Sequence, residues 1–216
     1  MKTFGTSWRN TIFKAMKVLL IYPKYPDTYF SFKHALQFIS KKASLPPLGL
    51  ITVSAMLPTT WHKKLVDMNV SPLLPEDIEW ADYVFISAMY IQKESVREVI
   101  DACKNHPVKI VAGGPLFTHE ALHYPLVDHF ILNEAEITLP LFLDDLNKAR
   151  SPQKIYKTTN FTDISQSPIP EYHLLSRKDY ASMNIQISRG CPFLCDFCEI
   201  PSLIGHKVRL KGADQI

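Results

Sequence analysis

Short apolar segments rich in β-branched residues recur along the first two thirds of the chain, with segments of helical spacing between them. Apolar runs this short are typical of strands that are covered on both faces. We therefore expect buried strands at residues 17–21, 64–67, 83–87, 108–112 and 129–132. A helix is predicted to begin within residues 45–50, because Pro46 and Pro47 fit a first helical turn. Further helices are predicted at 94–104, 118–123 and 137–148.

Alternating strands and helices predict an α/β fold, a doubly wound parallel sheet of the flavodoxin-like (Rossmann-type) class. In such sheets, ligands bind beyond the carboxyl ends of the strands. Five segments follow the predicted strands at this edge: Tyr22-Pro23, Asp67-Met68-Asn69, Ser87–Tyr90, Gly113-Gly114-Pro115 and Asn133–Glu136.

The chain changes character after residue 150. Residues 1–15 are interpreted as an N-terminal extension and 16–150 as the sheet domain. Residues 151–183 are rich in Ser, Thr, Pro and Gln, which predicts a linker. A new strand is expected at 184–188, and residues 184–216 are interpreted as the start of a second domain.

Composition excludes several classes of protein. The 216 residues are 46% hydrophobic and carry a net charge of only +3, which supports a packed core and argues against nucleic-acid binding. The apolar runs are shorter than the roughly 18–20 residues of a membrane span, and residues 1–15 lack the features of a secretory signal. Three of four cysteines fall within eight residues, which indicates a metal site in a reducing cytoplasm rather than a disulfide framework.

Those three residues, Cys191, Cys195 and Cys198, have the spacing C-x3-C-x2-C. Three thiolates on one loop can hold three irons of a cubane cluster, which leaves the fourth iron open to a ligand. Phe193 and Phe197 would then shield the cluster from water. One alternative is a zinc site with His206 as a fourth ligand, since Cys103 lies in a predicted helix of the other domain. The other is three unrelated thiols.

This spacing, together with Arg189-Gly190-Cys191-Pro192 and the aromatic residue before the last cysteine, resembles the signature of radical S-adenosylmethionine (radical SAM) enzymes. The resemblance implies a [4Fe–4S] cluster on the three cysteines, whose open iron binds S-adenosylmethionine, and Phe197 near the adenine. Reductive cleavage would give a 5′-deoxyadenosyl radical, with a ferredoxin or flavodoxin as electron donor. Residues 205–216 resemble the stretch before the next helix of a partial barrel, so we expect the sequence to be the front part of a longer enzyme.

Residues 16–148 resemble the cobalamin-binding domain that precedes the barrel in one large radical SAM subgroup. Five segments carry this resemblance: Pro46–Leu50, Val66–Asn69, Ile86–Met89, Ala112–Pro115 and Asn133–Pro140. The cofactor contacts it implies are Tyr22, Pro23, Gly49, Ser87, Gly113, Gly114, Asn133 and Glu136. The motif D-x-H-x-x-G, whose His ligates cobalt, is not found in the sequence. We therefore expect cobalamin without a protein His ligand, with His34 and His62 as remote candidates.

The implied contacts have plainer alternatives. Gly113 and Gly114 would let the backbone approach a nucleotide tail, or would simply form a tight turn. The hydroxyl of Ser87 would donate to that tail, or would be satisfied at its strand end. Glu134 and Glu136 at a helix start would be solvated or would pair with the helix dipole.

The resemblance implies methyl transfer or related radical chemistry on a small-molecule or lipid-like substrate. The alternative function is a non-catalytic cobalamin or corrinoid module with a vestigial cluster loop. Such a module would keep the fold of the enzyme without its activity. A flavin- or phosphate-binding protein is a third interpretation, although no Gly-rich or Ser/Thr-rich phosphate loop follows the first predicted strand.

Overall fold

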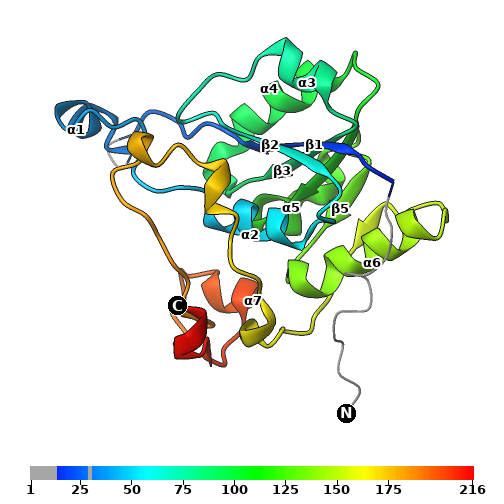
Figure 1. The fold of residues 1–216 in the computed structure, drawn as a ribbon. Helices are drawn as coiled ribbons and strands as arrows, with labels where there is room; N and C mark the ends of the chain where they lie inside the picture. Colours follow the sequence, from blue (N-terminus) through cyan, green and yellow to red (C-terminus); the bar gives the residue numbers. More distant parts are fainter. Residues whose placement is uncertain (1–13, 29–30) are drawn as a thin grey trace.

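The computed structural model describes residues 14–28 and 31–216 (Figure 1). The predicted N-terminal extension lies almost wholly outside these residues. A six-stranded sheet forms the centre of the molecule, with the strand order β2-β1-β3-β4-β5-β6, and each neighbouring pair is parallel. The strands are β1 Lys17–Tyr22, β2 His62–Asp67, β3 Tyr83–Ser87, β4 Lys109–Gly113, β5 His129–Ile131 and β6 Ile155–Tyr156.

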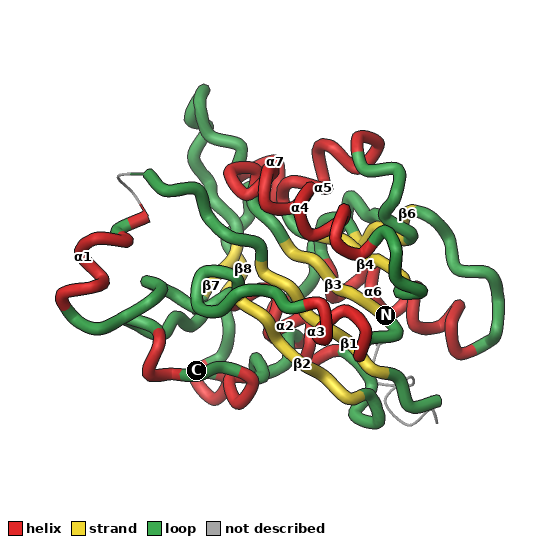
Figure 2. Tube along the Cα trace, turned by 90° about the horizontal axis from the view of Figure 1, so that it is seen from above, coloured by secondary structure: helices red, strands yellow, loops and turns green. Residues whose placement is uncertain are grey.

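Helices cover both faces of this sheet (Figures 1 and 2). The helices are α1 Lys33–Phe38, α2 Leu48–Met56, α3 Pro75–Trp80, α4 Lys93–Cys103, α5 Pro115–Glu120, α6 Ala135–Asn147 and α7 Ile200–Ile204. Apolar side chains of α2 and α6 pack on one face, against Val18, Leu20 and Phe85. Those of α3, α4 and α5 pack on the other, against Leu19 and Ile21. The predicted doubly wound α/β sheet is therefore confirmed.

Some elements differ from the sequence-based expectations, and each difference has a local cause. Helix α3 was not predicted, because six residues with one buried aliphatic side chain show little periodicity. Helix α5 begins at Pro115, three residues before the predicted start, since Pro fits the first helical turn. Strand β6 falls inside the predicted linker, where two residues are too few to signal a strand.

Residues 157–216, here called the C-terminal segment, contain little regular structure. They form short 3-10 turns, helix α7 and a two-stranded antiparallel hairpin of β7 Ser188–Arg189 and β8 Arg209–Leu210. The strand expected at 184–188 therefore begins only at Ser188. An isolated bridge between Ala43 and Tyr180 ties this segment to the loop before α2. Among the described residues, no helix is both long and apolar enough to cross a membrane.

Candidate functional site

Two adjoining cavities lie at the carboxyl edge of the sheet. Their volumes are about 250 Å³ and 680 Å³, and the residues that line both include Gly49, Ser87 and Pro115. Together they approach the upper part of the range of small-molecule and cofactor sites, roughly 300–1,000 Å³. Strand β1 has β2 on one side and β3 on the other, so the order of strands reverses beside these cavities, where doubly wound sheets bind ligands.

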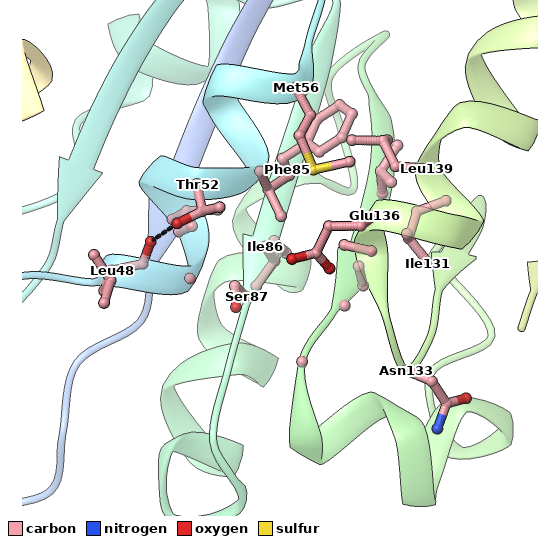
Figure 3. A pocket seen from close by; sticks show the side chains of 18 of the residues that line it. Leu48, Thr52, Met56, Phe85, Ile86, Ser87, Ile131, Asn133, Glu136 and Leu139 are labelled. Atoms are coloured by element: carbon pink, nitrogen blue, oxygen red, sulfur yellow. Dashed lines mark hydrogen bonds between the residues drawn. The ribbon is translucent and has the colours of Figure 1, made fainter. Parts of the chain in front are cut away.

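The smaller cavity lies between α2 and α6, above strands β3, β4 and β5 (Figure 3). Its apolar wall includes Met56, Phe85 and Leu139. Six of the residues that the sequence predicts as cofactor contacts line this cavity: Gly49, Ser87, Gly113, Gly114, Asn133 and Glu136. The structure thus brings together residues that lie up to 87 positions apart, from Gly49 to Glu136. In Figure 3 the carboxylate of Glu136 points toward Ile86, whereas the side chain of Asn133 points away from the other labelled residues.

The chain itself requires both glycines of the Gly113-Gly114 pair. A Cβ atom on Gly113 would lie 2.7 Å from the carbonyl oxygen of Ile131 on the neighbouring strand. Gly114 has φ +92°, and a Cβ there would lie 3.0 Å from the carbonyl oxygen of Ala88. The close approach of neighbouring backbone therefore explains these glycines without any ligand, although both also line the smaller cavity.

The larger cavity lies beyond the ends of β1, β2 and β3. Tyr22, one of the predicted contacts, lines it together with Tyr25, and the hydroxyl groups of the two residues are 2.6 Å apart. Pro23 lies outside the lining and is buried, and its carbonyl oxygen accepts hydrogen bonds from Gln92 and Asn69. These bonds hold the loop after β1, so Pro23 positions its neighbours at the cavity.

A buried carboxyl group beside the larger cavity holds the neighbouring loops through hydrogen bonds. Asp67 at the end of β2 is 4% exposed and accepts hydrogen bonds from the backbone and side chain of Asn69 and from the hydroxyl of Tyr180. Burial raises the pKa of Asp67 and outweighs these three bonds. Asn69 in turn accepts a hydrogen bond from the backbone of Tyr25. The network thereby fixes both the loop after β1 and a residue of the C-terminal segment.

Glu134 and Glu136 are not solvated. Both lie at the start of α6, where the helix dipole favours carboxylates, and both accept hydrogen bonds from Arg189 of the C-terminal segment. Ser167 also donates to Glu136, at 2.7 Å. Burial opposes ionisation of Glu136, but the hydrogen bonds and charge of Arg189 outweigh it and hold the pKa of Glu136 below its ordinary value.

The cysteine loop lies outside both cavity linings. Cys195 is exposed and Cys191 and Cys198 are partly exposed, while Cys103 is buried in α4. Within residues 14–28 and 31–216, no group of three or more His, Cys, Asp or Glu side chains is arranged to hold a metal. The three thiols match an iron–sulfur cluster in their donor chemistry, but they are not gathered as ligands in this structure. Phe197 is 93% exposed and Phe193 69%, so neither covers the loop here.

Sequence reasoning missed several residues of the site. Arg189 and Gln186 of the C-terminal segment line the smaller cavity, as do Thr52 and Met56 of α2. The sequence offers one signal for Arg189. It is a cation near the cysteines, and two carboxylates with which a cation can pair stand at the start of a predicted helix. The remote candidates His34 and His62 are exposed and line neither cavity.

The fold is an α/β domain of the doubly wound class, with two cavities at the carboxyl edge of its sheet. No protein-family model matches the chain. The chain is similar to an uncharacterized methyltransferase of Synechocystis sp., with 41% identity over 203 residues, 93% of this chain and 38% of that protein. It is 31% identical to the hopanoid C-2 methylase of Rhodopseudomonas palustris over 93% of this chain and 39% of that enzyme.

A more distant relative is the bacteriochlorophyllide d C-12(1)-methyltransferase of Chlorobaculum tepidum, with 22% identity over 93% of this chain and 43% of that enzyme. The chain thus has homologues that are methyltransferases and methylases. It spans about two fifths of the length of these three relatives.

Proposed function

We propose that this chain is the cobalamin-binding and cluster-bearing part of a radical SAM enzyme that transfers methyl groups. The observation that carries the proposal is the pair of adjoining cavities at the carboxyl edge of the sheet. The homology to methyltransferases and methylases agrees with it.

The two cavities suit the two parts of a cobalamin. The smaller one, mostly apolar and bounded by α2 and α6, would receive the nucleotide tail. The larger one, with Tyr22 and Tyr25 in its wall, would lie against the corrin. Bound cobalamin would supply a methyl group for transfer. The residues of this chain would orient the corrin and exclude water from the tail.

Cys191, Cys195 and Cys198 would hold a [4Fe–4S] cluster, and Phe197 would lie near the adenine of S-adenosylmethionine. The cluster would supply the electron for reductive cleavage of S-adenosylmethionine, after reduction by a ferredoxin or flavodoxin. Methyl transfer to unactivated carbon of a small-molecule or lipid-like substrate would then be the activity of the whole enzyme.

Gly49 offers a direct test of cobalamin binding. A Cβ atom on Gly49 would meet no atom within 4 Å, and the residue lines both cavities. The backbone therefore has room for a side chain at this position, and the leucine of a Gly49→Leu variant would extend into ligand space. We expect the parent chain to retain hydroxocobalamin on gel filtration, and Gly49→Leu to weaken binding by roughly ten-fold or more, since overfilling costs about 1–3 kcal/mol.

The matched control is Gly212→Leu, since a Cβ atom there has only the Gln215 side chain within 4 Å and Gly212 lies in neither cavity lining. This variant should bind hydroxocobalamin like the parent. If the parent retains no hydroxocobalamin, or Gly49→Leu binds as tightly, the cavities are not the cobalamin site.

Anaerobic reconstitution with iron and sulfide tests the cluster separately. We expect about four irons per chain and a visible charge-transfer band. Cys191→Ala should lower the iron content, while the control Cys103→Ala, in the buried face of α4, should not. Equal iron in Cys191→Ala and the parent would refute the cluster assignment. Cobalamin retention without iron would instead favour the non-catalytic cobalamin module.

A further inference from the structure

The β7–β8 hairpin places two cations directly opposite each other. Arg189 and Arg209 are partners in its antiparallel register, so their side chains project from the same face. Their side chains are 14% and 12% exposed. Like charges in directly opposite positions destabilise a strand pair, and poor access to water makes the repulsion stronger. The hairpin therefore depends on anions from elsewhere in the molecule.

The start of α6 provides these anions. The carboxylate of Glu134, 3% exposed, accepts from Arg189 Nη1 at 2.6 Å and from Arg209 Nη2 at 3.0 Å. The carboxylate of Glu136 accepts from Arg189 Nη2 at 2.8 Å and from Nη1 at 3.1 Å. Two arginines and two glutamates thus balance one another, and we call these four residues the arginine–glutamate clasp.

The clasp touches both the smaller cavity and the cysteine loop. Glu136 and Arg189 belong to the cavity lining. Two residues beyond Arg189, the backbone amide of Cys191 donates to the carbonyl of Gly205. Between them, Gly190 has φ +107°, and a Cβ there would lie 2.2 Å from the carbonyl oxygen of Lys207. The backbone from the clasp to the first cysteine therefore has little freedom.

We propose that the clasp couples occupancy of the smaller cavity to the position of the cysteine loop. A ligand in the cavity excludes water from the Glu136–Arg189 pair, and a lower local dielectric strengthens that pair. The hairpin is then held more firmly, and the loop with it. Because such coupling is reciprocal, a fixed loop also favours ligand binding. The four residues are positioning residues, and the ligand dependence of the coupling rests on the proposed function.

Hydrogen exchange followed by mass spectrometry measures this coupling on the full 216-residue chain. Peptides that cover residues 187–211 report the hairpin, and peptides of β1 and β3 serve as an internal reference for the fold. In the ligand-free chain, Glu134→Gln and Glu136→Gln should speed exchange in the hairpin and leave the reference strands unchanged. Hydroxocobalamin should slow exchange of the parent hairpin by roughly five-fold or more, the size of ordinary coupling.

The Glu136→Gln variant separates coupling from direct contact, because it keeps the shape of the side chain and removes its charge. It should lose the ligand-dependent slowing even at hydroxocobalamin concentrations that saturate the variant, whose affinity should fall because the coupling is reciprocal. The matched control, Glu171→Gln, removes a carboxylate of the C-terminal segment that bonds Lys63 rather than an arginine of the clasp, and it should keep the slowing.

Two results would overturn the inference while the proposed function stands: a parent chain that binds hydroxocobalamin without slower hairpin exchange, or a Glu136→Gln variant that keeps the slowing. If the parent binds no hydroxocobalamin, the proposed function and the coupling both fail. In that case the ligand-free comparison still tests whether the clasp holds the hairpin. This role of the clasp is refuted if the hairpin of Glu134→Gln exchanges no faster than that of the parent.

Discussion

The sheet domain and the C-terminal segment are held in place by different kinds of interaction. Strands β1 to β6 and their helices bury two continuous apolar clusters, one on each face of the sheet. Of the described residues with buried hydrophobic side chains, Ile164 and Tyr180 are the two that belong to the C-terminal segment. That segment is tied down mainly by polar contacts, among them Glu171 with Lys63, Tyr180 with Asp67, and the arginine–glutamate clasp.

The difference shows how the two parts of the candidate site are made. The cavities follow from the topology of the sheet and would survive many surface changes. The position of the cysteine loop depends on a few charged and hydrogen-bonded groups, each of which one substitution can remove. Apolar burial sets the stability of the first region, and polar geometry sets the order of the second.

Replacement of an aromatic residue by alanine should give the largest difference between the two regions in the free energy of unfolding. Phe117→Ala in α5, where the side chain is fully buried, should lower the free energy of unfolding by about 3–5 kcal/mol, because it leaves a large cavity. Phe197→Ala in the cysteine loop should change it by less than about 0.5 kcal/mol. Urea titrations followed by tryptophan fluorescence measure both, and equal losses would contradict the comparison.

Glycine substitution should give opposite signs in the two regions. Gly190→Ala places a side chain at a positive φ, which costs about 1–3 kcal/mol before the clash with Lys207 is added. Gly49→Ala in the first turns of α2 meets no atom, so it should stabilise the chain by up to about 1 kcal/mol. Tryptic cleavage within residues 187–211 reports the first change, and thermal unfolding reports the second. Slower cleavage of Gly190→Ala than of the parent would be the contrary result.

The ion pair of Glu171 with Lys63 should contribute more to the free energy of unfolding than a surface ion pair of the sheet domain. Glu171 accepts hydrogen bonds from Lys63 and Ser54, both buried or nearly so. Glu171→Gln leaves the Lys63 ammonium group without its counter-charge and should cost about 1–3 kcal/mol. Glu94→Gln removes the exposed partner of Arg97 and should cost less than about 0.5 kcal/mol. Chemical denaturation of the two variants side by side decides the point.

Thiol labelling should distinguish the regions with no change in stability. Cys103 is 2% exposed, and burial raises the pKa of its thiol to about 11, so it stays protonated and covered at pH 8. The loop thiols Cys191, Cys195 and Cys198 are all at least partly exposed. In the iron-free native chain, Ellman's reagent should therefore react with three thiols, and with a fourth only after denaturation. Rapid reaction of four thiols in the native chain would show that α4 is not packed as described.

The fold could be predicted from the sequence wherever apolar burial decides the structure. Residues 18–21 of β1 are all apolar and all fully buried, so composition alone indicated a strand covered on both faces. The ends of the parallel strands then placed Ser87, Gly113 and Glu136 at one edge. The cavities follow from that placement, because every carboxyl end of a parallel sheet lies on the same side.

The contacts of the C-terminal segment were beyond prediction, because they join distant polar residues. Arg189 meets Glu136 across 53 positions, and Tyr180 meets Asp67 across 113. Neither pair leaves a periodic pattern in the sequence. A carboxylate at a helix start is equally compatible with solvent, the helix dipole or a distant arginine, and only the docking of the hairpin selects among them.

The two edge strands of the sheet, β2 and β6, affect whether molecules associate with one another. An edge strand exposes unpaired backbone groups that can recruit another chain. On one side, β6 presents only two residues. On the other, β2 carries Lys64, whose side chain is half exposed, in its first half. A short edge and a charged edge both discourage strand addition between molecules, and with it the growth of this sheet into fibrils.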